Sequence, residues 1–280
     1  MGEPVREVMR EISGHTRMFA ILADPVDHVR TPMVFNGWFR ARGIDALLVP
    51  IEVPPASLPR LLDGLRAMTN LGGFVVTMPH KIALVELCDA VTESARRVGA
   101  VNTVRRDPDG RLVGTVFDGA GFVAGLRAHG HEPRGRRVWL AGAGGVACAI
   151  AFAIADAGAA RLTIHNRTAA RAAELAARVR AAHSNVAVAA AAGAADPAGH
   201  ELVINGTSLG LHAGDALPCD VARLDPGAVV AEVVMQPETT ALLAAAAARG
   251  HEIHHGRHML DEQIRLMADF MRVPRSSGAG

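Results

Sequence analysis

Short apolar runs alternate along the chain with longer segments whose apolar residues recur at helical spacing. Such runs, closed by Gly, Pro or Asp, predict buried strands, and the longer segments predict helices that pack on them. Pro50 weakens one predicted strand, whereas Pro32 suits the first turn of a helix. The expected strands cover residues 18–22, 46–52 and 73–77, and the expected helices cover residues 31–42, 58–69, 84–88 and 93–98.

The pattern changes after residue 100. Two apolar runs flank Asp107-Pro108-Asp109-Gly110, which predicts a β-hairpin. A helix is expected from Asp118, after which strand and helix signals alternate in the order of a doubly wound parallel sheet. The alanine-rich residues 147–198 are interpreted as helices packed closely on that sheet, because alanine favours helix. The further strands are expected within residues 138–141, 161–168, 201–210 and 228–235.

The length of 280 residues favours two domains, and a second unit is expected to begin near Asp118. The fold class is α/β, with an N-terminal α/β domain followed by a Rossmann-type domain built on a doubly wound parallel sheet. A last helix over residues 259–272 carries an amphipathic stripe, and residues 276–280 are expected to be a frayed tail.

Composition narrows the possible partners to small molecules. A net charge of +1, an aromatic content of 4% and the lack of tyrosine argue against nucleic acid, and no apolar stretch suits a membrane span. Cys88, Cys148 and Cys219 have no CxxC spacing and are interpreted as reduced thiols of a cytoplasmic protein. The first fifteen residues mix acids and bases and are not expected to be a signal peptide.

Glycines follow the strand at residues 138–141 in the pattern G-x-G-x-x-A. Gly142 permits a tight turn, Gly144 lets the backbone approach a pyrophosphate, and Ala147 lets the next helix pack closely on the sheet. Gly145 lies at the start of that helix, whose free N–H groups are expected to face the phosphates. The pattern therefore predicts a dinucleotide site, against the alternative of a turn without a ligand.

The end of the next strand distinguishes two cofactors. NAD binding usually needs an acid there, but the sequence reads Asn166-Arg167-Thr168, with Arg171 one turn further on. Arg167 and the Thr168 hydroxyl offer donors to a 2′-phosphate, so NADP is favoured over NAD. The alternative makes both arginines a solvated face and Thr168 a helix cap.

Several segments together resemble the shikimate dehydrogenase family. The resemblance covers about residues 17–272 and is specific in its combination of T-x-P-H-K, G-A-V-N-T, a later D-G and N-R-T. In chain order, the segments are DPVDHVRTP, VVTMPHK, GAVNT, GTVFDG, AGAGGVA, NRT, INGTSLG and GRHMLDEQ.

The resemblance implies an NADP- or NAD-dependent oxidoreductase with its active site between two domains. Residues 1–117, completed by 256–280, would bind the substrate, and residues 118–255 would bind the cofactor. Lys81 and Asp118 match the catalytic pair, and a partly desolvated lysine can exchange the proton of a secondary alcohol. Residues matched to substrate contacts are Thr31, Thr77, Asn102 and Gln263, and Asn205, Thr207 and Ser208 would lie near the nicotinamide.

The sequence departs from the family at several positions that bind the substrate in other members. Each lost donor to a hydroxyl or carboxylate costs about 1–3 kcal/mol, so a less polar substrate is a hypothesis, unless His28 or Arg30 compensates. The same changes would also suit a substrate whose size is limited by Phe117 and Met235. The apolar replacements are Val29, Val75, Val116, Phe117 and Met235.

Other interpretations remain open. The chain could be a cofactor-binding sensor, although the pair Lys81 and Asp118 argues against this, or a folate-type bicyclic dehydrogenase, which shares the glycine turn. Residues 251–258 hold four histidines at helix-like intervals, but Gly256 interrupts them, so no metal site is expected. The oligomeric state is expected to be a monomer or a homodimer.

Overall fold

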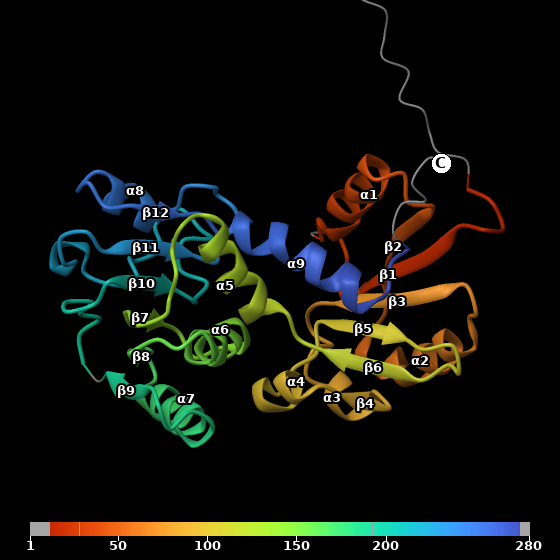
Figure 1. The fold of residues 1–280 in the computed structure, drawn as a ribbon, viewed down its shortest axis with the longest axis horizontal. Coiled ribbons are helices and arrows are strands. Elements are labelled where there is room, and N and C mark those ends of the chain that lie inside the picture. Colours follow the sequence, from red (N-terminus) through yellow and green to blue (C-terminus); the bar gives the residue numbers. More distant parts are fainter. Residues whose placement is uncertain (1–11, 28, 192, 275–280) are drawn as a thin grey trace, which may run out of the picture.

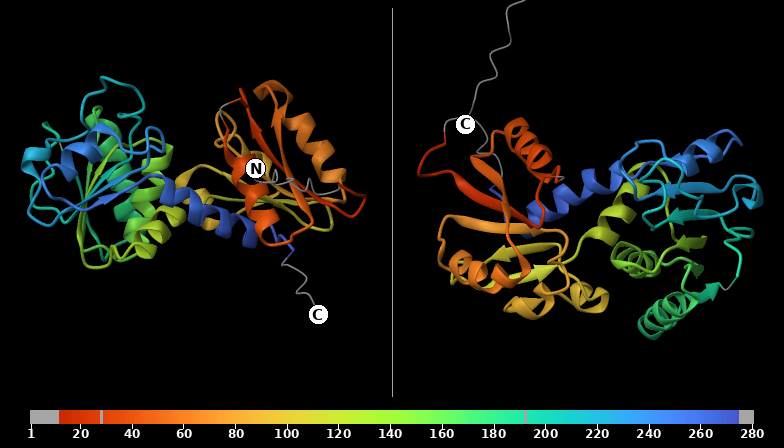
Figure 2. Two further views of the ribbon diagram at one scale, coloured as in Figure 1. Left: turned by 90° about the horizontal axis from the view of Figure 1, so that it is seen from above. Right: turned by 180° about the vertical axis from the view of Figure 1, so that it is seen from behind.

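A computed structural model describes residues 12–27, 29–191 and 193–274, and within them the chain forms two six-stranded sheets (Figure 1). The sheets lie at opposite ends of an elongated molecule, and one long helix near the C-terminus runs from one to the other (Figure 2). Most of the segment judged not to be a signal peptide, the predicted frayed tail and His28 lie outside the described residues.

The first sheet has the strand order β2-β1-β3-β5-β6-β4. β1 pairs parallel with β2 and β3, whereas β5 pairs antiparallel with β3 and β6, so the predicted hairpin is confirmed. Pro50 is tolerated because β2 is an edge strand. The strands are β1 (Arg17–Ala23), β2 (Ala46–Glu52), β3 (Leu71–Val76), β4 (Ala90–Val91), β5 (Thr103–Arg106) and β6 (Leu112–Thr115).

Alternate residues of β1 and β3 divide the core of this half into two layers, as the period of a strand requires. Phe19, Ile21 and Val75 face one apolar cluster, whereas Ala20 and Phe74 face another. Helix α1 packs in the first cluster and helix α2 in the second. The helices of this half are α1 (Thr31–Ala41), α2 (Leu58–Ala67), α3 (Leu84–Leu87) and α4 (Glu93–Val98), with a 3-10 turn at Pro55–Ser57.

The second sheet is entirely parallel, in the order β12-β11-β10-β7-β8-β9, which confirms the doubly wound fold. The chain order reverses between β7 and β10, the position where such sheets bind ligands. The strands are β7 (Arg137–Ala141), β8 (Arg161–His165), β9 (Ala187–Ala191), β10 (Leu202–Asn205), β11 (Val229–Glu232) and β12 (Ile253–His254). The helices are α5 (Asp118–Ala128), α6 (Gly145–Asp156), α7 (Ala169–Ala182), α8 (Ala241–Ala247) and α9 (Arg257–Phe270), with a 3-10 turn at Val221–Arg223.

The interpretation of residues 147–198 as helical is wrong at its end, because residues 187–191 form the edge strand β9. Only Val188 of this strand is buried, and its backbone pairs along the whole of β8. Pairing with a neighbouring strand has therefore overridden the helix propensity of alanine, which a local pattern cannot show.

Helix α9 returns to the first half of the molecule, as predicted. Ile264, Met267 and Met271 are buried in the cluster that contains Phe19 and Phe35. Its first turns pack along α5 instead.

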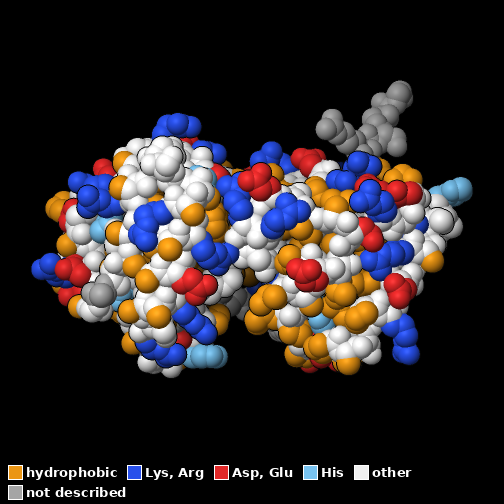
Figure 3. Space-filling view, turned by 90° about the horizontal axis from the view of Figure 1, so that it is seen from below, with side chains coloured by type: hydrophobic (Ala, Val, Ile, Leu, Met, Phe, Trp, Pro, Cys, Tyr) orange, Lys and Arg blue, Asp and Glu red, His pale blue; other side chains and the backbone are white. Residues whose placement is uncertain are grey.

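None of the described helices is long and apolar enough to cross a membrane. On the face shown in Figure 3, acidic and basic side chains are interspersed over both halves.

Glycines let α5 approach two other helices closely. A methyl group at Gly119 would overlap the carbonyl oxygen of Ala149 in α6, and one at Gly121 would overlap the side chain of Gln263 in α9. At Gly125 the added carbon would lie 2.9 Å from the carbonyl oxygen of His258. Helix α5 is therefore held between α6 and α9 at a spacing that only glycine allows.

We predict that Gly119→Ala destabilises the protein, although alanine is the better helix former. Overpacking costs about 1–3 kcal/mol, and it outweighs the gain in helix propensity of about 1 kcal/mol. Urea denaturation measures the difference. Gly37→Ala in α1 is the control, because a methyl group there meets nothing within 4 Å and should stabilise the protein. A similar effect of both substitutions would contradict the role given to Gly119.

Candidate active site

An ion pair joins Lys81 to Asp118. Lys81 lies in the turn after β3, where its carbonyl oxygen accepts a hydrogen bond from the Val101 N–H at 2.8 Å, and Asp118 opens α5. The ammonium Nζ lies 2.8 Å from Oδ2 of Asp118. The lysine side chain is 24% exposed and that of the aspartate 8%, so the lysine is partly accessible and the aspartate is almost buried.

Two amides hold the other oxygen of the same carboxylate. Oδ1 of Asp118 accepts hydrogen bonds from Nδ2 of Asn102 at 2.8 Å and from Nε2 of Gln263 at 3.1 Å. The carboxylate thus has three donors, from the turn after β3, from the residue before β5 and from α9. Charge-assisted hydrogen bonds of this kind are stronger than neutral ones and fix the orientation of the acid.

Asn102 is itself held from both sides. Its Oδ1 accepts from the Thr103 hydroxyl at 2.9 Å and from the Phe117 N–H at 3.0 Å, which sets its Nδ2 toward Asp118. The sequence had matched Asn102 and Gln263 to substrate contacts. The structure brings both to Asp118, where both position this carboxylate, and their contact with a substrate stays a prediction. Thr103 was not predicted, and its neighbour Asn102 was the only signal for it.

The predicted carboxylate-binding hydroxyls lie at the ends of two elements. Thr31 begins α1 and Thr77 follows β3, and both residues are half-buried. In the part of the chain that the structure describes, neither hydroxyl has a hydrogen-bond partner, so both can bind a ligand. The Thr77 N–H donates to the Leu22 carbonyl oxygen at 3.1 Å, which fixes the backbone there.

Three of the apolar replacements belong to one cluster. Val29, Val75 and Phe117 pack in the same apolar cluster as Leu260 and Ile264. Val75 is only 5% exposed, and the ring of Phe117 lies edge-on to Phe270 at 5.7 Å. These side chains therefore belong to one continuous apolar cluster. Val116 belongs to the other core cluster, and Met235 is 44% exposed.

A groove of about 720 Å³ separates the start of α1 from the loop after β11. Arg30 and Val34 line it on one side, and Met235 lines it on the other. Arg257 and Leu260 of α9 also face it. Of the two residues expected to compensate for lost polar contacts, Arg30 thus lies in a groove between the two halves, and His28 lies outside the described residues.

The glycine turn lies at the switch point of the second sheet. Gly142 has a φ of +111°, and a side chain there would lie 2.9 Å from the Gly206 carbonyl oxygen, so glycine is required. Ala147 is fully buried against this turn. At Gly144 and Gly145 none of the described residues lies within 4 Å of an added carbon, which leaves open space among them at the N-terminus of α6. The turn therefore has room for a phosphate next to free N–H groups.

The residues after β8 are exposed and carry two unpaired cations. Among the described residues, neither Arg167 nor Arg171 has an ion-pair partner, and both are exposed. Thr168 occupies the N-cap position of α7, but its side chain makes no capping hydrogen bond, which weakens the helix-cap alternative. Asn166 donates to the Thr168 carbonyl oxygen at 3.0 Å. The arginines and the threonine hydroxyl remain available to an anion.

A buried acid organises the end of β10. Glu232 is fully buried, and burial raises the pKa of its carboxyl group. It accepts hydrogen bonds from Nδ2 of Asn205 at 2.9 Å and from the Thr240 hydroxyl at 3.0 Å. The Thr207 hydroxyl donates to Oδ1 of Asn205 at 2.7 Å, so this predicted cofactor residue is already engaged within its own turn. Glu232 was not predicted, although an acid inside the apolar run of β11 is a signal for it.

The proton site and the glycine turn are mechanically linked. Gly119 follows Asp118, and it contacts the backbone of Ala149, which lies in the second turn of α6. A rise of 1.5 Å per residue puts the start of α6 only about 6 Å further along that helix. A parallel sheet with a glycine turn at its switch point, close to a partly buried lysine–carboxylate pair, is typical of nucleotide-dependent oxidoreductases.

Comparison with known proteins identifies the family. Family models match residues 21–104, as a shikimate dehydrogenase substrate binding domain, and residues 127–197, as shikimate / quinate 5-dehydrogenase. A shikimate dehydrogenase (NADP(+)) from Rubrobacter xylanophilus is 42% identical over 251 residues, which make up 89% of this chain and 88% of that protein. The chain therefore belongs to the shikimate dehydrogenase family.

Two solved structures show how closely the fold agrees. The shikimate 5-dehydrogenase of Listeria monocytogenes, in complex with shikimate and NAD, has a TM-score of 0.88 at 29% identity, covering 96% of each chain. The ligand-free 5-ketofructose reductase of a Gluconobacter strain has a TM-score of 0.87 at 32% identity, covering 94% of this chain and 95% of that one. One fold thus carries proteins named for different substrates.

Proposed function

We propose that the protein interconverts a secondary alcohol and a ketone on a cyclic hydroxy acid of the shikimate type, with NADP as cofactor. The observation that carries this proposal is the Lys81–Asp118 ion pair, oriented by two amides and linked through Gly119 to the helix at the glycine turn. The physiological direction stays open, because the same pair serves oxidation and reduction.

The proposed mechanism assigns the proton to Lys81. In the oxidation, neutral Nζ accepts the proton of the substrate hydroxyl, and in the reduction the ammonium donates it to the carbonyl oxygen. Asp118 orients both the lysine and the hydroxyl. NADP, when bound, supplies hydride transfer at its nicotinamide. Asn102 and Gln263 keep the carboxylate in place through the cycle.

The single lysine of the sequence supports this assignment. Every other Lys or Arg position of the chain is arginine, and Lys81 alone is a lysine. An arginine would serve equally well as a cation for Asp118, but its guanidinium does not release a proton in proteins. The chain thus has an ammonium at the one position where the proposal needs proton exchange.

The residues after β8 support NADP, as in the name of the Rubrobacter relative. Arg167, Arg171 and the Thr168 hydroxyl would hold the 2′-phosphate, and Asn166 would support their turn. The open backbone at Gly144 and Gly145 would hold the pyrophosphate, with Gly142 and Ala147 shaping the turn. These observations make NAD the less suitable cofactor.

The domain boundaries, location and assembly state complete the proposal. Residues 1–117 and 256–280 form the substrate domain, and residues 118–255 form the cofactor domain.

The protein acts in the cytoplasm as a monomer or homodimer, and in keeping with that location all three cysteines are free thiols. Burial raises the pKa of Cys88 and Cys219 to about 12, which keeps these thiols protonated and unreactive.

A second candidate substrate is a less polar or uncharged hydroxy ketone. The apolar cluster that contains Val29, Val75 and Phe117 supports a less polar substrate, and the name 5-ketofructose reductase indicates that the fold accepts an uncharged ketone elsewhere. In the proposal for a hydroxy acid, Thr31, Thr77 and Arg30 would bind the carboxylate. A role as a non-catalytic sensor is disfavoured, since a sensor needs no proton-exchanging pair.

We predict that Lys81→Ala and Lys81→Arg both lower kcat by about 100-fold to 10,000-fold, the usual contribution of a general acid–base group. Lys81→Arg is the sharper test because it keeps a cation beside Asp118. Its free energy of unfolding should stay near that of the wild type, and NADP affinity should be unchanged in both variants. Turnover near the wild-type rate in either variant would refute the proton role of Lys81.

Arg167→Ala should weaken NADP binding by about tenfold or more, because a charge-assisted hydrogen bond is worth about 1.5–3 kcal/mol. NAD binding should hardly change, since NAD lacks the 2′-phosphate. Quenching of nicotinamide fluorescence on the reduced cofactors gives both affinities. Arg161→Ala, exposed at the opposite end of β8, is the control. Equal losses for the two cofactors would remove Arg167 from the phosphate site.

The substrate is tested by comparing kcat/KM for shikimate, quinate, less hydroxylated analogues and 5-ketofructose. Val29→Ser restores a hydroxyl near the carboxylate site, and it should raise kcat/KM for shikimate while leaving the uncharged ketone unchanged. A high wild-type efficiency with shikimate that Val29→Ser does not improve would exclude the less polar substrate. A higher kcat/KM for the uncharged ketone than for shikimate would exclude the hydroxy acid as the substrate.

A further inference from the structure

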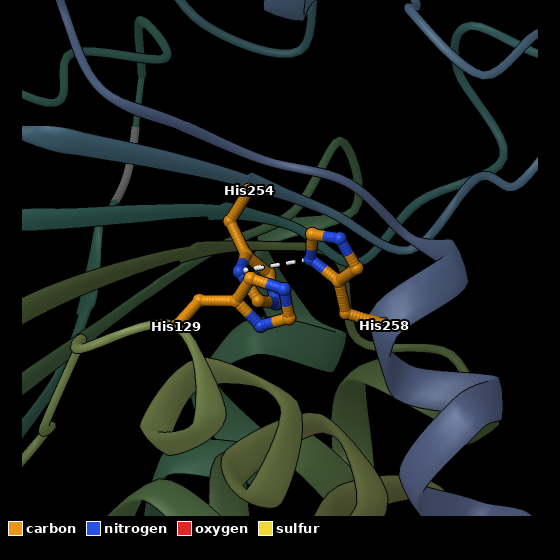
Figure 4. Close-up of side chains that lie close together, drawn as sticks. All are labelled: His129, His254 and His258. Atoms are coloured by element: carbon orange, nitrogen blue, oxygen red, sulfur yellow. Dashed lines mark hydrogen bonds between the residues drawn. The ribbon is translucent and has the colours of Figure 1, made fainter.

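Five histidines gather where α5 ends, β12 lies and α9 begins, outside the proposed active site. His254 stands in β12 and His258 in the first turn of α9, and the bend at Gly256 between them brings the two rings together (Figure 4). His129 follows α5 and stacks on His258 with ring centroids 3.6 Å apart. His131 and His255 lie edge-on to His254 and His258, at 5.8 and 5.9 Å.

Two of these rings already have the spacing of metal ligands. Nδ1 of His254 lies 3.4 Å from Nδ1 of His258. Zinc–nitrogen bonds of about 2.0–2.1 Å in a tetrahedron put two nitrogen ligands roughly 3.4 Å apart. An ion placed between these two atoms would therefore need little movement of either side chain, and both side chains are buried at one junction.

His129 can complete the set. Its Nδ1 lies 2.9 Å from the Gly125 carbonyl oxygen, which can only accept, so Nδ1 carries the proton and Nε2 keeps a lone pair. Metal-binding histidines usually have their second nitrogen held in this way. Ligand atoms of all three residues lie within 4.8 Å of one another. His129 is exposed, so its ring can tilt out of the stack toward the ion.

The two buried rings keep their lone pairs at neutral pH. Burial, reinforced by the neighbouring imidazoles, lowers the pKa of His254 to about 3 and that of His258 to about 4. Both rings are therefore neutral, which is the form that binds metals. Nε2 of His254 is buried with no hydrogen-bond partner among the described residues, so Nδ1 is the nitrogen of this ring that faces another possible ligand.

We propose that His129, His254 and His258 bind one divalent transition-metal ion of the zinc type, with water as the fourth ligand. Imidazole suits zinc, nickel and copper, and three histidines plus water is a known zinc arrangement. The eleven residues of α5 put His129 about 16 Å along the helix from Asp118. The ion would therefore join β12 and α9 to the end of α5, remote from the proposed proton transfer.

The test uses the full chain without an affinity tag, stripped of metal with a chelator. Calorimetric titration with Zn²⁺ should give one ion per chain, and Co²⁺ should give the visible absorption of a tetrahedral site. His129→Ala should weaken Zn²⁺ binding by about tenfold or more, since loss of an outer-shell partner alone typically costs that much. His258→Gln should act likewise, and circular dichroism reports whether this more buried change still folds.

His15→Ala is the matched control, because it removes an exposed histidine far from the cluster along the chain and should leave Zn²⁺ binding intact. Saturating Zn²⁺ should raise the Tm of the wild type by several degrees and that of His129→Ala by less. The kcat of His129→Ala should match the wild type. No bound Zn²⁺, or equal affinity in wild type and His129→Ala, would overturn the proposal.

Discussion

The carboxylate of Asp118 is the interaction on which the rest of the site depends. It is almost buried, and a buried charge is tolerable only when donors surround it. Its donors come from positions 81, 102 and 263, which lie in three separate parts of the chain. The first sheet and the last helix must therefore both be in place before this charge is satisfied. The ion pair that helps to satisfy this charge also orients Lys81, the only lysine of the sequence.

A second constraint follows from the first. Asp118 can meet Gln263 only if α5 runs close to α9, and Gly121 and Gly125 make that approach possible. Gly119 does the same toward α6, whose N-terminus forms the glycine turn. A single glycine-rich helix thus sets the spacing between the Lys81–Asp118 pair and the proposed phosphate site. The glycines of α5 allow these close helix contacts, despite their poor helix propensity.

Local sequence patterns predict much of this organisation, whereas the remainder depends on contacts between residues that are far apart in the chain. The hairpin, the parallel sheet and the glycine turn each follow from a few neighbouring residues, and the structure has all three. Strand β9 was missed because its sequence is alanine-rich and only pairing with β8 makes it a strand. The histidine cluster was dismissed because Gly256 interrupts its spacing. In the folded chain Gly256 is the bend that joins His254 to His258, and His129 arrives from another helix.

The proposed proton chemistry and the apolar cluster involve different side chains, in a fold that carries proteins named for shikimate and for 5-ketofructose. Lys81, Asn102 and Gln263 all bind Asp118, so removing any of these donors leaves the buried carboxylate less well satisfied. Val29, Val75 and Phe117 belong to an apolar cluster, where substitutions that keep volume disturb no hydrogen bond of that network. Under the proposed mechanism, substrate preference can therefore change through this cluster while the proton exchange at Lys81 stays the same.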